Sequence, residues 1–201
     1  MPPRLVLASA SPRRRDILRQ LGLEPEVRPA DVDERLLPGE DPGEHVRRLA
    51  REKAARVLEF EPDALVIAGD TVVVRDGEVL GKPADPDEAV AMLVSLSGKT
   101  HQVLSGLALA RADRAVDAVT RTSVCFRTFD QGTARGYVAT GEPMDKAGAY
   151  GIQGLGAALV EGVEGDYYSI VGLPVAVLLQ LFEQMGWRYD FGGLRAIDPT
   201  R

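Results

Sequence analysis

The sequence has little of the residue types on which many metal centres and catalytic triads depend. Its 201 residues include one cysteine, Cys125, and two histidines, His45 and His101. A disulfide within the chain and a cysteine-rich zinc site are therefore excluded, and histidine-based metal sites and catalytic triads are disfavoured. If the chain is an enzyme, we expect carboxylate, lysine and arginine side chains to carry its chemistry.

The sequence also lacks an excess of positive charge and long apolar runs. Its net charge is −6, whereas a nucleic-acid-binding chain is usually basic overall. No apolar run approaches the length of a membrane span, and the N-terminal residues lack the apolar core of a signal peptide. We therefore expect a cytoplasmic protein that contacts neither nucleic acid nor membrane.

The chain alternates between short apolar runs and amphipathic stretches, which predicts an α/β fold with a mixed sheet. Hydrophobic residues make up 45% and charged residues 27%, an ordinary globular composition. We expect residues 1–190 to form a single domain and residues 191–201 a C-terminal tail. The expected helices cover residues 12–21, 42–60, 86–96, 130–140 and 175–185. The expected strands cover residues 5–8, 26–28, 64–68, 72–74, 78–80, 100–110, 116–129, 157–163 and 187–189.

The first informative stretch, residues 5–15, predicts a buried strand that runs directly into a helix. Ser11 is a good N-cap residue, and Pro12 suits the first helical position. The free N–H groups and positive dipole end of this helix favour a strongly charged anion such as phosphate. Hydroxyl and guanidinium groups surround the same point: Ser9, Ser11, Arg13, Arg14 and Arg15. A capped helix with a solvated basic first turn is the alternative interpretation.

Asp70 stands between two apolar runs of predicted strand. An aspartate there is costly to bury unless it is paired or binds a metal, so a merely structural Asp70 is the less favoured interpretation. Lys53 falls on the apolar stripe of the 42–60 helix. It either extends along the edge of that stripe to solvent or reaches a buried anion, and the pattern leaves both open.

Two further segments carry candidate ligand-binding residues. Lys82 follows a predicted hairpin turn and is expected to return near the level of Asp70, where it could neutralise phosphate. Residues 141–156 are so rich in glycine that we expect no regular structure, and the glycines would let the backbone approach a ligand closely. Gln153 carries the side-chain amide of this segment, which has both donor and acceptor capacity. Residues 166–174 are expected to form a turn.

Four motifs carry a resemblance to one family. They are LASASPRR at 7–14, AGDT at 68–71, GKP at 81–83 and DKAGAYGIQG at 145–154. In this order they resemble the Maf family of nucleoside-triphosphate pyrophosphatases, over about residues 5–179. The Arg-Arg pair and the Tyr-Gly-Ile-Gln-Gly run are similar to those of the branch that acts on dTTP and UTP, and on modified pyrimidine nucleotides.

The resemblance implies a fold like that of the inosine-triphosphate pyrophosphatases. This is an elongated, mixed β-sheet flanked by helices, in two lobes with a deep cleft. The implied reaction is attack of water on the α-phosphorus of a nucleoside triphosphate, which yields the monophosphate and pyrophosphate. A divalent metal, Mg²⁺ or Mn²⁺, and a homodimer are also implied.

The resemblance further assigns roles to individual residues. Whether Asp70 activates the water or holds the metal stays open, and Glu34 is implied as a second metal ligand. Gln153 would accept a hydrogen bond from uracil N3–H and donate one to O4, which suits dTTP and UTP. The implied catalytic residues are Asp70, Lys53 and Lys82, and the implied substrate-binding residues are Ser9, Ser11, Arg13, Arg14, Thr71 and Gln153.

Two other functions remain as alternatives from the sequence. One is a pyrophosphatase of the sister branch that acts on 7-methyl-GTP. The other is a non-catalytic nucleotide-binding regulator of septum formation. The intact set of Asp70, Lys53 and Lys82 favours an enzyme, while house-cleaning of modified nucleotides and control of division are equally open as its purpose.

Overall fold

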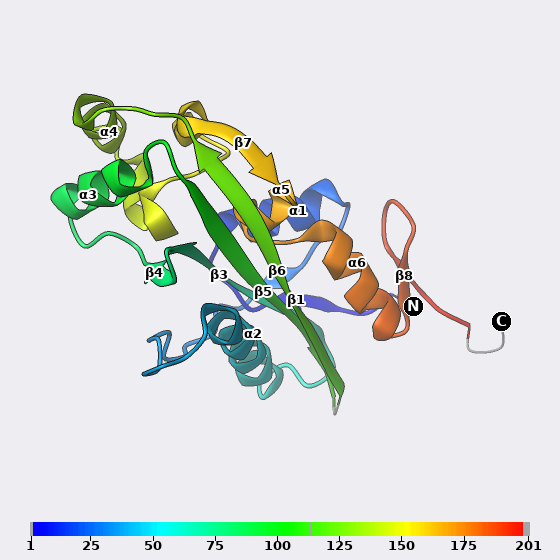
Figure 1. Cartoon of the computed structure of the whole chain (residues 1–201). Helices are drawn as coiled ribbons and strands as arrows, with labels where there is room; N and C mark the ends of the chain where they lie inside the picture. The colour runs from blue at the N-terminus through cyan, green and yellow to red at the C-terminus, as the bar shows by residue number, and fades with distance from the viewer. Residues whose placement is uncertain (1, 113, 199–201) are drawn as a thin grey trace. The chain divides into compact units, whose positions relative to one another are not determined.

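The apolar runs of the sequence form the strands of a mixed sheet (Figure 1). The structure is a computed structural model that describes residues 2–112 and 114–198. Within these ranges, one seven-stranded sheet has the order β2-β1-β3-β5-β6-β7, with β4 paired to β3 off this path, and β8 and β9 form a second sheet. Strand β1 pairs parallel with β2 and β3, whereas the β3–β4 and β6–β7 pairs are antiparallel, so the predicted mixed sheet is confirmed. The strands are β1 (Leu5–Leu7), β2 (Glu26–Val27), β3 (Leu65–Arg75), β4 (Glu78–Leu80), β5 (Thr100–Arg111), β6 (Arg114–Phe126), β7 (Val160–Glu164), β8 (Trp187–Tyr189) and β9 (Leu194–Ala196).

Aspartate caps and prolines set where several of the helices begin. Asp41, Asp85 and Asp130 each accept hydrogen bonds from main-chain N–H groups of the helix that follows. The first helix ends before Gly22, whose φ of +71° is readily adopted only by glycine. The α-helices are α1 (Pro12–Gln20), α2 (Pro42–Leu58), α3 (Pro86–Leu96), α4 (Gln131–Val138), α5 (Tyr167–Val171) and α6 (Val175–Gln184).

The described residues divide into two compact units. The first takes the chain up to Asp70, then Ser105–Val119, and again from Gly172 onward. The second takes Thr71–Leu104 and Thr120–Val171. Strands β3, β5 and β6 each contribute residues to both units, so each unit is described by itself.

In the first unit, α2 packs on one face of the sheet through small side chains. Ala50, Ala54 and Val57 of α2 form one core cluster with sheet residues that include Val66 and Ala108. The closest approach is at Gly106 of β5, where a Cβ atom would lie 2.2 Å from the carbonyl oxygen of Val46. A glycine at this position therefore allows the main chain of α2 to pass directly over the sheet.

In the second unit, aromatic and aliphatic side chains from α3, α4 and the sheet share one core. His101 belongs to this core. Its ring packs edge-on against Phe126 and Tyr150, and Nε2 lies 2.8 Å from the Tyr150 hydroxyl oxygen. Burial lowers the pKa of His101 to about 4, so the ring is neutral at pH 7. His101 is thus a packing residue.

The structure corrects several sequence-based boundaries. Strand β3 runs unbroken through Gly69 and Asp70, where two separate apolar runs were predicted. Residues 167–171 form helix α5 instead of part of a turn, because one and a half helical turns are too short to show a period. The glycine-rich segment is not irregular but contains three short 3₁₀-helices: η1 (Glu142–Asp145), η2 (Ala147–Ala149) and η3 (Leu155–Leu159).

The predicted tail also contains regular structure. Strand β9 pairs antiparallel with β8, and Leu194 on it is buried. A three-residue strand lacks enough alternation to be recognised in the sequence. Residues 199–201 of the predicted tail lie outside the described residues.

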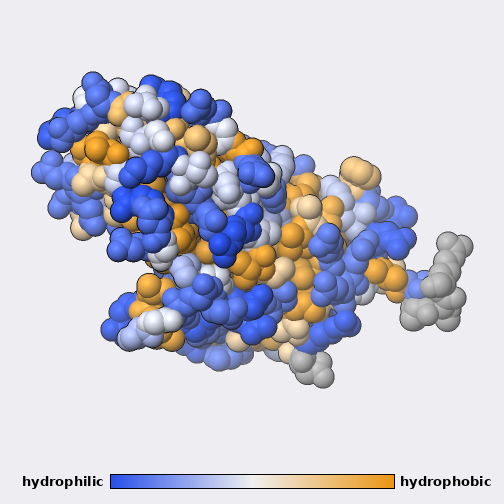
Figure 2. Space-filling model, in the orientation of Figure 1, coloured by the Kyte–Doolittle hydropathy of each residue, from blue (hydrophilic) through white to orange (hydrophobic). Residues whose placement is uncertain are grey.

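The surface carries hydrophilic and apolar residues side by side. On the face shown in Figure 2, apolar residues stand in small groups among hydrophilic ones. Large apolar side chains at the surface include Phe60, Leu37 and Phe191. Among the described residues, the structure contains no helix with both the length and the apolar character that a membrane crossing requires.

Substitution by alanine should have opposite effects on stability at two glycines. Gly106→Ala places a methyl group against the main chain of α2, and overpacking of this kind destabilises by about 1–3 kcal/mol or more. Gly136→Ala lies in α4 with no described atom near the added methyl group, and should stabilise by about 0.5–1 kcal/mol through helix propensity. Urea unfolding of both variants measures the two changes. A Gly106→Ala variant as stable as the wild type would show that α2 does not pack against β5 in this way.

Candidate active site

The junction between β1 and α1 is held by the hydroxyl of Ser9. Its Oγ accepts one hydrogen bond from the main-chain N–H of Ser11 at 3.2 Å and one from Nη1 of Arg14 at 2.9 Å. A hydroxyl has two acceptor lone pairs and one proton, so both acceptor positions of Ser9 are used. What Ser9 still offers is its O–H, a donor suited to an anion.

Ser11 occupies the predicted N-cap position, and Pro12 lies within the first helical turn. The Ser11 side chain nevertheless makes no capping hydrogen bond. The hydroxyl of Ser11 is therefore not committed to the helix end, contrary to the prediction from its cap preference. Arg13 at the same end is partly exposed, whereas Nε of Arg15 lies 3.5 Å from Asp16, its neighbour in the chain.

Arg14 is buried beneath this junction. Its Nε donates to the carbonyl oxygen of Gly172 at 2.8 Å, in addition to the bond from Nη1 to Ser9. Burial lowers the pKa of Arg14, and the negative charges of Asp70 and Glu34 oppose that shift. A Cβ atom at Gly69 would lie 3.1 Å from the carbonyl oxygen of Gly106 and 3.4 Å from Nε of Arg14, so glycine there chiefly avoids a tight contact with the main chain of β5.

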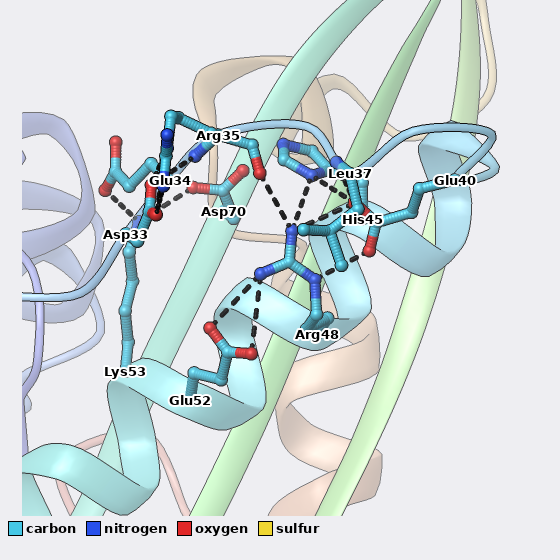
Figure 3. A network of polar contacts seen from close by, with 10 residues as sticks. All are labelled: Asp33, Glu34, Arg35, Leu37, Glu40, His45, Arg48, Glu52, Lys53 and Asp70. Atoms are coloured by element: carbon cyan, nitrogen blue, oxygen red, sulfur yellow. Dashed lines mark hydrogen bonds and ion pairs between the residues drawn. The ribbon is translucent and has the colours of Figure 1, made fainter.

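Lys53 joins the two carboxylates predicted as metal ligands. Its side chain is almost fully buried, and Nζ lies 2.8 Å from Oδ1 of Asp70 and 2.5 Å from Oε1 of Glu34 (Figure 3). Of the two positions that the sequence left open for Lys53, the structure selects contact with a buried anion. Asp70 is itself 13% exposed, whereas Glu34 reaches in from the surface with 57% of its side chain exposed.

The donor set at this point fits a hard divalent cation. Asp70 and Glu34 supply carboxylate oxygens, and Mg²⁺ is commonly held by one or two carboxylates, with water and substrate phosphate in the other positions. Within residues 2–112 and 114–198, no cluster of three or more His, Cys, Asp or Glu side chains forms an all-protein cage. A metal bound by Asp70 and Glu34 would take its other ligands from water or a substrate phosphate.

The loop that carries Glu34 is tied to helix α2 through Glu40 and Arg48 (Figure 3). Glu40 accepts from Nε and Nη2 of Arg48 at 2.6 and 2.9 Å and from the main-chain N–H of Leu37 at 3.1 Å. Nδ1 of His45 lies 3.0 Å from the same carboxylate, and Arg48 also donates to the carbonyl oxygen of Arg35. The Arg48 hydrogen bond is the main cause that lowers the pKa of Glu40 to about 2.

Sequence reasoning missed this network. Glu40 and Arg48 lie on opposite sides of a helix cap and eight positions apart, a spacing that no local motif predicts. The one available signal was Lys53 itself. A lysine that points into the protein needs carboxylates beside it, and the loop that carries such a carboxylate must be held in place.

The remaining predicted site residues lie in the second unit. Thr71 follows Asp70 on β3, Lys82 lies two residues beyond the end of β4, and Gln153 lies between η2 and η3. Lys82 and Gln153 are both exposed. The main chain beside Lys82 is tied to the glycine-rich segment, because the carbonyl oxygen of Gly81 accepts from the N–H of Gly148 at 3.0 Å.

Most of the chain matches the model of a known family. Residues 4–185 match the family described as Maf-like protein. The chain belongs to the Maf family. The matched residues include residues of both compact units, so both units belong to this one family domain.

Relatives of this Maf protein carry the name dTTP/UTP pyrophosphatase. One from Anaeromyxobacter dehalogenans (strain 2CP-1) is 53% identical over 191 residues, which cover 93% of this chain and 96% of the relative. One from Symbiobacterium thermophilum is 50% identical, with 94% and 97% covered. One from Moorella thermoacetica is 50% identical, with 91% and 95% covered. The predicted resemblance to the Maf family is confirmed.

Acid should weaken the Glu40 network in a defined pH interval. Because the pKa of Glu40 falls to about 2 on folding, from an ordinary 4.5, its contribution to stability is present above pH 4.5 and is lost as the pH falls toward 2. We expect the free energy of unfolding to fall more for the wild type than for Glu40→Gln between pH 5 and 2.5. Urea unfolding at several pH values measures the difference.

Glu52→Gln is the matched control for this experiment. Glu52 also contacts Arg48, at 3.2 Å, but is half exposed and does not touch the loop that carries Glu34. Its pH profile should follow the wild type. Parallel profiles for wild type and Glu40→Gln would contradict the assignment of the stabilising charge to Glu40.

Proposed function

We propose that this Maf protein hydrolyses dTTP and UTP to the nucleoside monophosphate and pyrophosphate. The observation that carries the proposal is the buried Lys53 between Asp70 and Glu34, within the same unit as a β1–α1 junction whose Ser9 hydroxyl is left as a donor. The names of the relatives support the choice of dTTP and UTP as substrates.

The β1–α1 junction is proposed to bind phosphate. Ser9 donates its O–H, Ser11 offers a hydroxyl not used for capping, and Arg13 adds charge at the helix N-terminus. Arg14 acts from beneath, because its bond to Ser9 aligns that hydroxyl as a donor. Positioning and neutralisation of charge are what phosphoryl transfer chiefly requires.

Asp70 and Lys53 are proposed as the reacting centre. Glu34 and Asp70 would hold a divalent ion, Mg²⁺ or Mn²⁺, whose positive charge would stabilise the phosphate oxygens. Lys53 holds both carboxylates in place and keeps a second positive charge beside them. Asp70 is assigned either to this ion or to the attacking water as a general base, and the substitution below separates the two.

Three residues of the second unit retain proposed roles from the family resemblance. Lys82 is proposed to neutralise phosphate, while Thr71 and Gln153, together with Arg13, are proposed to select the base. We further propose that residues 1–190 form the catalytic domain, and that residues 191–201, which include β9, supply no residue to the site. We also propose that the protein is a cytoplasmic homodimer and that it acts on modified pyrimidine nucleotides.

Pyrophosphate release from a panel of nucleotides tests the proposed activity. The panel contains UTP, dTTP, CTP and 7-methyl-GTP, each with Mg²⁺ or Mn²⁺. We expect UTP and dTTP to be hydrolysed far faster than the other two. Preference for 7-methyl-GTP would place the chain in the sister branch, and no release from any nucleotide would contradict catalysis.

Asp70→Asn should reduce hydrolysis of UTP by several orders of magnitude while the protein stays folded. The amide keeps the shape of the side chain but loses the negative charge that faces Lys53. If Asp70 is a metal ligand, excess Mn²⁺ should restore part of the rate, because an amide oxygen is still a weak ligand. If Asp70 is the general base, no metal concentration should restore it. Asp63→Asn, at an exposed turn, is the control, and near-normal turnover of Asp70→Asn would show that Asp70 is structural.

Gln153→Ala should narrow the preference for UTP over CTP. A fixed amide pairs with uracil N3–H and O4, whereas cytosine reverses both groups and leaves about two polar groups unpaired, at roughly 1–3 kcal/mol each. The variant should therefore lose catalytic efficiency on UTP with little change on CTP. Measurement of kcat/KM for UTP, dTTP and CTP decides the point. An unchanged ratio of UTP to CTP would remove Gln153 from base selection.

A further inference from the structure

The carboxylate of Glu142 is the centre of a hydrogen-bond cluster in the second unit. Oε1 accepts from the hydroxyl of Tyr137 at 2.7 Å and from the N–H of Gly156 at 3.1 Å, while Oε2 accepts from the N–H of Leu155 at 2.8 Å. The Tyr137 hydroxyl in turn accepts from the N–H of Gly151 at 3.1 Å. One carboxylate and one phenol thus bind the main chain of residues 151–156 at both ends.

The glycines of this segment are explained by the same cluster. A Cβ atom at Gly154 would lie 2.3 Å from Oε2 of Glu142, and one at Gly156 would lie 2.6 Å from the Tyr137 hydroxyl oxygen. Glycine is therefore needed for the loop to close onto Glu142 and Tyr137. The sequence interpretation, in which these glycines make room for a ligand, does not identify this contact inside the protein.

Electrostatics strengthen the cluster. Burial acts to raise the pKa of Glu142, but the hydrogen bonds from Leu155, Tyr137 and Gly156 outweigh it and lower that pKa overall. Burial and the Glu142 carboxylate raise the pKa of Tyr137. At neutral pH the pair is therefore an ionised acceptor and a protonated donor, the combination in which hydrogen bonds to charged groups are strong.

Gln153 lies between the two anchored ends. Gly151 is bound on one side, and Leu155 and Gly156 on the other, so the main chain at Gln153 is held. The Gln153 side chain itself is exposed, and the structure gives it no hydrogen-bond partner among the described residues. The loop thus presents a polar side chain from a fixed main chain.

We propose that Glu142, with Tyr137, is a positioning residue that sets the base selectivity of Gln153. The proposal rests on the proposed function, in which Gln153 selects uracil and thymine. An amide makes two hydrogen bonds to the N3–O4 edge of one base only where its position relative to that base is fixed. A main chain that limits where the Gln153 amide can lie meets this requirement, and Glu142 supplies this limit.

The anchor is the set of hydrogen bonds by which Glu142 and Tyr137 hold the main chain of residues 151–156. Two substitutions weaken it to different degrees. Glu142→Gln keeps the size of the side chain but turns one acceptor into an NH₂ group, which faces a main-chain N–H. Tyr137→Phe removes only the hydroxyl that donates to Glu142 and accepts from Gly151. Asp85→Asn is the control, since Asp85 caps α3 in the same unit and accepts from Glu88 instead of from the loop.

Catalytic efficiency on UTP and CTP gives the functional readout. We expect the UTP to CTP ratio to fall about tenfold in Glu142→Gln and less in Tyr137→Phe, the change associated with one hydrogen bond to a charged group. The fall should come from a higher KM for UTP, with kcat changed less. In a Gln153→Ala background, Glu142→Gln should change the ratio no further, and Asp85→Asn should keep the wild-type ratio.

Amide hydrogen exchange tests the anchor without any nucleotide. The N–H groups of Gly151, Leu155 and Gly156 should exchange faster in Glu142→Gln than in the wild type. Unchanged exchange would overturn the anchor. Faster exchange with an unchanged UTP to CTP ratio would overturn the positioning role, as would a ratio that Glu142→Gln still changes in the Gln153→Ala background. If the wild type releases no pyrophosphate from UTP, the proposed function fails on that measurement alone, and hydrogen exchange still decides the anchor.

Discussion

The first unit depends on placing one buried ammonium group against two carboxylates. A lysine inside a protein loses its hydration and is tolerated only where opposite charge replaces it. Lys53 meets that condition through Asp70 on β3 and Glu34 on a loop. The contact with Asp70 requires α2 to lie close to the sheet, and the bare main chain of Gly106 under Val46 allows that approach. The small side chains of the α2 face follow from the same constraint.

Both loops that carry candidate ligand residues are held by the same physical device. In one, Glu40 accepts from Arg48 and the N–H of Leu37; in the other, Glu142 accepts from Tyr137 and from main-chain N–H groups. In each case a poorly exposed carboxylate fixes main chain, while the residue offered to the ligand remains accessible. Rigidity and accessibility are thus assigned to different side chains, so the main chain of each loop loses little freedom when the exposed residue binds.

The sequence predicts those features of the fold and the site whose cause lies within a short stretch of the chain. Hydrophobic period and capping residues predict the longer helices, and the apolar residues on both sides of Asp70 predict that its carboxylate has a partner. Lys53 could be reduced to two alternatives but not decided, because its partner Glu34 comes from a loop with no period. The roles of Glu40 and Glu142 are not identifiable in the sequence, since each binds main-chain N–H groups together with a side chain, Arg48 or Tyr137, at a spacing that no local motif predicts. Helix α5 and strand β9 are too short to show a hydrophobic period in the sequence.

Arg14 shows how a buried residue can support the proposed phosphate site from within the protein. The sequence places it among the cations at the start of α1, yet its guanidinium is buried and donates to Gly172 and Ser9. By filling one acceptor position of Ser9, while the N–H of Ser11 fills the other, it leaves that hydroxyl with its proton alone to offer. A hydroxyl that can only donate binds an anion, which accepts hydrogen bonds, but not a group that itself donates. In the proposed phosphate site, a preference for negative charge would therefore come from a buried arginine as well as from the helix end.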